Sequence, residues 1–150
     1  MKIEPGALDA NILVYAVEAS APQHAVSRAL IEAARNPTTA LYLTSQVLCE
    51  FYSIVTNRRR VARPRSPAEA LNAISVFLAL PGIRVLPITA EAVEGWMALL
   101  QRHPVTGGDV FDLQIVATML ANNIRRIYTF NARDFEVFTE LTVATPPEPA

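Results

Sequence analysis

Short apolar runs alternate with longer segments of helical periodicity along this chain. The runs are three or four residues long, rich in large aliphatic and β-branched side chains, and bounded by Gly, Pro, Thr or Asn, a pattern typical of buried strands. They predict strands at residues 7–9, 41–43, 84–86 and 126–129, with an edge strand at 141–143. The segments between them are long enough for helices.

Local signals mark where several of these helices begin. Ser66 precedes Pro67 and stands three residues before Glu69, the arrangement of a capping box with Pro at the first helical position. Thr44 or Ser45 can cap the helix that follows the second strand. Asp109 can cap a later helix, which has a predicted apolar stripe and carries Asp112 in its first turn. The stripe consists of Leu113, Val116, Ala117 and Leu120.

The alternation of short strands and helices predicts the fold class. Parallel strands need long crossover connections, usually helices, so the pattern indicates an α/β protein with a short, mainly parallel central sheet in a three-layer α/β/α sandwich. We expect one domain over residues 1–144 and a flexible tail over residues 145–150, where three of six residues are Pro. A length of 150 residues suits a single core.

Acidic side chains stand where these elements begin and end. Asp9 ends the first strand, and Asn131 and Asp134 follow the strand at 126–129. Glu50 and Asp112 lie on helices that begin at the same edge of the predicted sheet. Because ligands of open α/β sheets bind beyond the carboxyl ends of the strands, we expect these acids to converge there.

Each acid alone has an ordinary structural explanation. Asp109 can cap a helix, and Asp112 can interact favourably with the positive end of the helix dipole. Asp9 can end a strand, and Asp134 can close a turn. Glu50 is the exception, since a carboxylate beside a core stripe costs free energy unless it is paired or coordinated. Clustered carboxylates repel one another and require a cation, and hard oxygen ligands favour Mg²⁺ or Mn²⁺. Such a site predicts phosphodiester hydrolysis.

Composition excludes several classes of protein. The chain is 51% hydrophobic and 18% charged, as expected for a globular protein, and it has no apolar run long enough to span a membrane. The N-terminus lacks the apolar core of a signal peptide, which predicts a cytosolic, cytoplasmic protein. The single cysteine, Cys49, excludes an internal disulfide and predicts a buried packing role. His24 and His103 are expected to face solvent, although His103 could contact substrate.

The positive charge is concentrated in one loop. Net charge is −1, which argues against a uniformly basic nucleic-acid binder, but five of the twelve arginines fall within residues 58–65. This loop is either a solvated surface or a set of contacts to the phosphates of RNA. The candidate RNA-binding residues are Arg58, Arg59, Arg60, Arg63 and Arg65.

Four ordered segments carry a family resemblance. The sequences of residues 8–16, 45–51, 110–117 and 129–135 resemble the four acidic motifs of PIN-domain ribonucleases, and their order and spacing are most similar to those of the VapC toxins of bacterial toxin–antitoxin pairs. The resemblance extends over about residues 7–138. It implies an endoribonuclease dependent on Mg²⁺ or Mn²⁺, usually a homodimer, that a VapB-like antitoxin inhibits.

The resemblance also assigns roles to individual residues. Asp9, Glu50 and Asp112 match the three principal metal-binding, catalytic acids. Many relatives have Asp where this chain has Asn131, so the fourth catalytic and metal-binding position belongs either to Asp134, which supplies a charge, or to Asn131, and the site holds either one metal ion or two. Four polar residues are expected to orient or assist these acids, namely Asn11, Ser45, Asp109 and Asn131.

Three functional hypotheses follow. The first is a ribonuclease toxin with an antitoxin partner and an RNA substrate. The second is an RNA-processing nuclease of the same fold without an antitoxin. The third is a non-catalytic RNA-binding protein, which the Asn131 departure favours.

Overall fold

The computed structural model, which describes residues 2–149, has a five-stranded sheet at its centre. Its strands lie in the order β3-β2-β1-β4-β5, and every neighbouring pair is parallel. The chain therefore builds the sheet outward from β1 in one direction and then returns to build β4 and β5 on the other side. The strands are β1 (Gly6–Leu8), β2 (Leu41–Leu43), β3 (Ile83–Val85), β4 (Arg126–Tyr128) and β5 (Thr142–Ala144).

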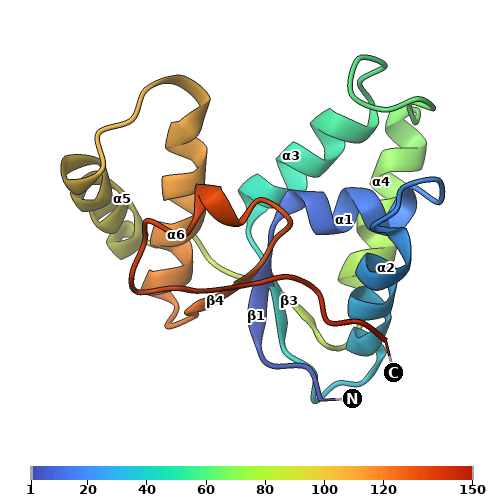
Figure 1. Cartoon of the computed structure of the whole chain (residues 1–150), viewed down its shortest axis with the longest axis horizontal. Helices are drawn as coiled ribbons and strands as arrows, with labels where there is room; N and C mark the ends of the chain where they lie inside the picture. The colour runs from blue at the N-terminus through green and yellow to red at the C-terminus, as the bar shows by residue number, and fades with distance from the viewer. Residues whose placement is uncertain (1, 150) are drawn as a thin grey trace.

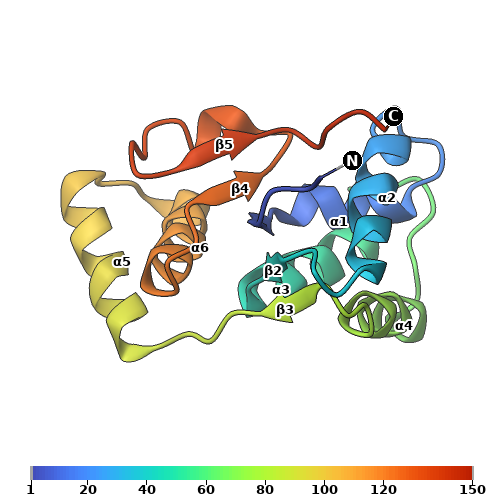
Figure 2. The same cartoon turned by 90° about the horizontal axis from the view of Figure 1, so that it is seen from below.

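Helices cover both faces of this sheet. α1, α2 and α4 lie on one side and α6 on the other, as Figures 1 and 2 show, and α3 packs against α1 and α4. The predicted three-layer sandwich and its five strand positions are confirmed, and the last strand is indeed at an edge. The helices are α1 (Ala10–Val17), α2 (His24–Glu32), α3 (Ser45–Val55), α4 (Pro67–Leu78), α5 (Ala90–Arg102) and α6 (Val110–Ala121), with short 3-10 helices η1 (Ala33–Arg35), η2 (Gly107–Asp109) and η3 (Ala132–Asp134).

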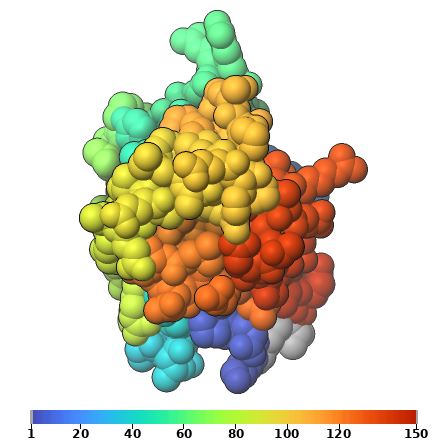
Figure 3. All heavy atoms as spheres, turned by 90° about the vertical axis from the view of Figure 1, so that its left-hand side faces the viewer, coloured from blue at the N-terminus to red at the C-terminus, as the bar shows by residue number. Residues whose placement is uncertain are grey.

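α6 is buried on nearly every side. Its predicted stripe is present, but Ile115, Thr118 and Met119 are buried as well. The reason is α5, which packs along α6 and covers the side that faces away from the sheet (Figure 3). A helix enclosed in this way loses the one-sided pattern of a surface helix.

The helix caps agree with the sequence prediction, and the structure decides between Thr44 and Ser45 as the cap of α3. Ser66 and Glu69 form the complete capping box of α4. Thr44, and not Ser45, caps α3, because its hydroxyl oxygen accepts a hydrogen bond from the backbone N–H of Val47 at 3.1 Å. Gly82 allows a close backbone approach, since a Cβ atom there would lie 2.6 Å from the carbonyl oxygen of Thr39.

The chain beyond β5 has no regular secondary structure over residues 145–149. Pro146 is nevertheless buried, so the beginning of this tail lies against the domain. The flexibility of the tail stays a prediction. None of the helices within residues 2–149 combines the length and the hydrophobicity that crossing a membrane requires.

Candidate active site

Asp9 occupies the point where the strand order reverses, between β1 and β4. It directly follows β1 and caps α1, its Oδ1 accepting a hydrogen bond from the N–H of Ala10 at 2.7 Å. Its Oδ2 accepts from the hydroxyl of Thr129 at 2.7 Å and from the side-chain amide of Asn11 at 3.3 Å. The residue is only 7% exposed. Burial raises the pKa of Asp9, and the bonds from Thr129 and Ala10 partly oppose that rise.

Thr129 is a site residue that the sequence reasoning missed. Its buried hydroxyl donates to Asp9 and also accepts from the backbone N–H of Asn131 at 2.9 Å and from the amide of Asn11 at 3.4 Å. One hydroxyl has one donor and two acceptor positions, so these bonds use its full capacity. Thr129 thereby fixes the Asp9 carboxylate to the end of β4. A threonine directly after a strand and before a polar turn was the available signal.

Glu50 is held by a second residue that the sequence reasoning missed. Gln46, one turn earlier on α3, donates from Nε2 to Glu50 Oε1 at 2.8 Å and to the backbone carbonyl of Phe111 at 2.9 Å. Phe111 precedes Asp112 on α6. Gln46 therefore joins the helix that carries Glu50 to the helix that carries Asp112.

The pKa of Asp112 is affected by all the other acids of the site. Partial burial raises its pKa to about 7, with further contributions from the carboxylates of Asp134, Asp9, Glu50 and Asp109 in that order. A neighbouring negative charge disfavours ionisation only when it is close, so all of these carboxylates lie around Asp112. The sequence prediction that distant acids meet at one edge of the sheet matches this arrangement.

Asp134 and Asn131 line different cavities next to the acids. Asp134 ends η3, raises the pKa of both Asp9 and Asp112, and shares a cavity of about 190 Å³ with Asp109 and Asp112. Asn131 instead lines a separate cavity beside the arginine loop. Asp134 is thus the residue whose charge reaches the other acids.

Two of the residues expected to assist the acids behave differently. Asp109 stands at the N-cap position of α6, but its backbone is helical and its side chain makes no capping hydrogen bond, because η2 continues directly into α6. Its carboxylate faces the acidic cavity. Ser45 is exposed and has no hydrogen bond to any of the acids within the described residues. Asn11 does contact Asp9, as expected for an orienting residue.

Predictions for three other side chains were wrong. Cys49 is exposed and not packed in the core, because its position on α3 turns away from the sheet. His24 is half-buried, with Nδ1 lying 2.8 Å from the carbonyl oxygen of Tyr15. His103 is half-buried too, its ring edge-to-face against Phe138 and lining the cavity of Asp112 and Asp134.

The arginine loop divides into two groups. Arg65 donates to the Glu18 carboxylate and to the carbonyl of Val17, and both side chains of the ion pair are mostly buried. Arg65 therefore holds the loop to the end of α1 and is not available to RNA. The remaining arginines of the loop have no ion pair with any carboxylate in residues 2–149, namely Arg58, Arg59, Arg60 and Arg63.

The acids suit a hard divalent cation by their chemistry, since they offer only carboxylate oxygens and repel one another without one. Within residues 2–149, however, no three Asp, Glu, His or Cys side chains are placed closely enough to form a metal site as they stand. The predicted metal cluster is therefore not preformed, and its carboxylates would have to rotate toward a shared ion.

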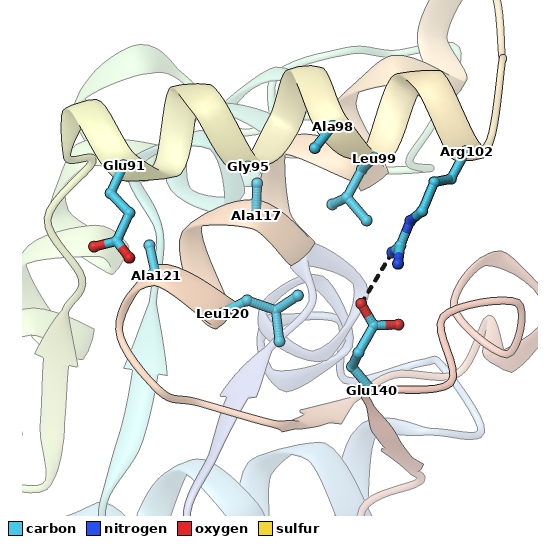
Figure 4. Close-up of a pocket in the computed structure, with 9 residues that line it drawn as sticks. All are labelled: Glu91, Gly95, Ala98, Leu99, Arg102, Ala117, Leu120, Ala121 and Glu140. Carbon is cyan, nitrogen blue, oxygen red and sulfur yellow. Dashed lines mark hydrogen bonds and ion pairs between the residues drawn. The ribbon is translucent and has the colours of Figure 1, made fainter.

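A cavity of about 330 Å³ elsewhere is not part of this site. It lies between α5 and α6, where Gly95 and Ala117 face each other and an ion pair of Arg102 with Glu140 closes one end (Figure 4). Small residues on both helices leave this space. The acidic cluster contributes no residue to it.

Comparison with known proteins identifies the family of the chain. The family model described as "PIN domain" matches residues 7–141. The chain belongs to the PIN-domain family. This PIN domain is 37% identical over 120 residues to ribonuclease VapC43 of Mycobacterium tuberculosis, an alignment that covers 77% of this chain and 79% of the relative.

Solved structures share the fold. The crystal structure of VapC20 of Mycobacterium tuberculosis, described as a sarcin-ricin loop cleaving toxin, has a TM-score of 0.65 at 20% identity and covers 88% of this chain and 94% of its own. The VapBC2 structure of Rickettsia felis, bound to a DNA fragment from its promoter, has a TM-score of 0.65 at 19% identity and covers 95% and 98%. The overall arrangement of strands and helices is therefore shared with these solved structures.

Proposed function

We propose that this PIN-domain protein is an endoribonuclease that hydrolyses RNA phosphodiester bonds with the help of Mg²⁺ or Mn²⁺. The observation that carries the proposal is the group of acids that converge on Asp112, whose pKa is raised to about 7 by partial burial and, after it, by the charges of these neighbours. Carboxylates maintained in such an unfavourable arrangement suit a functional site, where a cation would relieve the repulsion. Relatives named ribonucleases support the same reaction class.

Two groups of residues have different roles in this proposal, one binding the cation and the other orienting the acids. Asp9, Glu50, Asp112 and Asp134 would hold the cation, which when bound polarises a phosphate and lowers the pKa of a water molecule. Thr129 and Asn11 keep Asp9 oriented, and Gln46 does the same for Glu50. Asp112, partly protonated at neutral pH, would give up its proton as positive charge enters the site.

We also infer that a small antitoxin protein inhibits this enzyme. Structures of similar fold are described as VapBC2 and as a toxin–antitoxin complex from Klebsiella pneumoniae. A VapB-like protein encoded directly upstream is the expected partner. The homodimer and the cytoplasmic location remain predictions, and size-exclusion chromatography with light scattering of the purified chain tests the first.

Cleavage of labelled RNA by the purified chain tests the enzyme. We expect cleavage with Mg²⁺ or Mn²⁺ and none with EDTA. Asp9→Asn and Asp112→Asn should each lower the rate at least about 100-fold, because even partners of metal ligands contribute up to that factor. Glu94→Gln, an exposed carboxylate on α5, is the matched control and should cleave normally. Full cleavage by either active-site variant contradicts the assignment.

The competing function is RNA binding without cleavage. It is favoured by Asn131 in the fourth motif and by the lack of a preformed three-acid site among the described residues. In that case RNA would bind tightly and stay intact whether Mg²⁺ or EDTA is present. The same assay therefore separates the two functions.

A further inference from the structure

A second cavity adjoins the acids on the side of the arginine loop. It has a volume of about 310 Å³, and we call it the Arg60 pocket. Its walls come from α1, the loop after α1, the end of α3 and the arginine loop, and the residues used below are Asn11, Tyr15, Ser20, Ile54, Arg60 and Asn131. The sequence singled out Arg60 in the arginine loop and Asn11 and Asn131 beside the acids, but only the fold places them in one cavity.

The Arg60 pocket is connected to the acids through its floor. Asn11 lines the pocket and its amide also contacts the Asp9 carboxylate at 3.3 Å. Asn131 lines the pocket as well, and its backbone N–H is bound to Thr129, which donates to Asp9. A group bound in the pocket would thus be one side chain away from Asp9.

The charge of the pocket suits a phosphate. Glu18 is the carboxylate in its lining, and the Arg65 ion pair neutralises that charge. Arg60 has no carboxylate partner within the described residues, so the wall retains a positive charge. The cavity that Asp112 itself lines contains three carboxylates, those of Asp109, Asp112 and Asp134, and offers no such attraction. A polyanion would therefore approach the acids from the Arg60 side.

The remaining lining suits a nucleobase. Ile54 and neighbouring aliphatic side chains supply an apolar wall, and Tyr15 contributes an aromatic ring that is edge-to-face with Phe130. The exposed side-chain amide of Asn131 makes no hydrogen bond within residues 2–149, so it has both a donor and an acceptor available. Unstacked RNA bases are recognised by this combination of apolar or aromatic surface and hydrogen-bonding edges.

We propose that the Arg60 pocket binds one unstacked nucleotide of the RNA substrate beside the cleaved bond and selects its base. The proposal rests on the ribonuclease function proposed above. Its volume is at the small end of small-ligand pockets, which fits one nucleotide and not a helix of a partner protein. Arg60 would contact the adjoining phosphate, and Asn131 with Ser20 would contact the base.

Binding of short RNAs to blocked and open pockets tests the proposal. The probes are fluorescein-labelled pentamers of U, C, A and G and a pentamer with a central abasic nucleotide, and every protein carries Asp112→Asn so that RNA stays intact. We expect the preferred pentamer to bind about 5- to 100-fold more tightly than the abasic one. Ala62→Trp, which fills the pocket, should remove this preference. Ala68→Trp, on an exposed residue of α4 outside the pocket, should keep it.

A second pair of variants tests the phosphate contact without filling the pocket. Arg60→Ala should weaken all pentamers and lower the slope of log affinity against log salt concentration by about 1, whereas Arg59→Ala, in the same loop but outside the pocket, should do less. Base preference that survives Ala62→Trp overturns the proposal. Loss of antitoxin binding with unchanged RNA binding in that variant also overturns it and assigns the pocket to a protein partner.

The two proposals fail separately. If the chain with Asp112 intact does not cleave RNA in Mg²⁺, the ribonuclease function fails, and the binding measurements still decide whether the pocket selects a base. If it cleaves RNA but the abasic pentamer binds as tightly as the others, only the pocket proposal fails.

Discussion

Asp112→Asn should stabilise the metal-free protein while it abolishes cleavage. The pKa of Asp112 rises from its ordinary value of 3.8 to about 7. A pKa difference of one between the folded and unfolded protein corresponds to about 1.4 kcal/mol. The upper limit of the stability gained by Asp112→Asn above pH 7 is therefore about 4 kcal/mol. Two effects reduce this limit. Asp112 is half-buried, so solvent screens part of the repulsion. A charged acid in the first turn of a helix also stabilises the helix by about 0.3–1 kcal/mol, which Asn would lose. A net gain of about 1–2 kcal/mol is expected.

The sign of the pH dependence follows from the raised pKa. An acid whose pKa is higher in the folded state contributes stability that is complete below about pH 4 and is lost as pH rises through about 7. The wild type loses this contribution and the neutral Asn variant does not. The advantage of Asp112→Asn should therefore be near zero at pH 4, roughly 40% of its full size at pH 5 and complete at pH 8.

Thermal denaturation in EDTA at pH 5 and pH 8 measures this difference. For a chain of this length, 1–2 kcal/mol corresponds to a Tm increase of roughly 2–8 °C at pH 8. Glu94→Gln, which removes an exposed carboxylate, is the control and should leave the Tm unchanged at both pH values. Addition of MgCl₂ should raise the Tm of the wild type more than that of Asp112→Asn. A variant no more stable than wild type at pH 8, or equally stabilised at both pH values, refutes the reasoning.

Four further substitutions test positioning and packing. Gln46→Leu should lower kcat for RNA cleavage roughly 10- to 100-fold with KM nearly unchanged, because it breaks the link between α3 and α6; a rise in KM alone would contradict this role. Arg65→Ala should lower the free energy of unfolding in urea by roughly 1.5–3 kcal/mol without weakening RNA binding, since Glu18 loses its partner. Arg63→Ala should weaken RNA binding and leave the free energy of unfolding unchanged. Gly82→Ala should cost roughly 1–3 kcal/mol in the same urea titration, because its methyl group would lie 2.6 Å from a backbone carbonyl oxygen; unchanged stability would show that the turn can move.

The positions of Asp9 and Asp112 could be predicted because these acids stand at the ends of elements. Asp9 follows a strand and Asp112 falls in the first turn of a helix, and both boundaries have local causes in neighbouring residues. The capping box of Ser66 is equally local. Given parallel strands, element boundaries at the carboxyl ends must meet at one edge, so convergence of the acids follows from topology.

What the acids touch depended on packing between distant segments. The hydroxyl of Thr129 reaches Asp9 across 120 positions of the chain, and Gln46 reaches the carbonyl of Phe111 across 65. Neither contact has a periodicity that a sequence displays. The same holds for Arg65, which resembles its neighbouring arginines in sequence but binds Glu18.

The sequence by itself determined the order of the elements, the parallel sheet and the acids at its edge, because strand length, helix caps and element boundaries are set by residues close together in the chain. Tertiary structure alone decided the exposure of Cys49, the role of Arg65 and the pocket beside Asn11. Side-chain direction is fixed only when segments far apart in sequence pack together, and a rotation of about 100° between successive helical residues separates a core position from an exposed one.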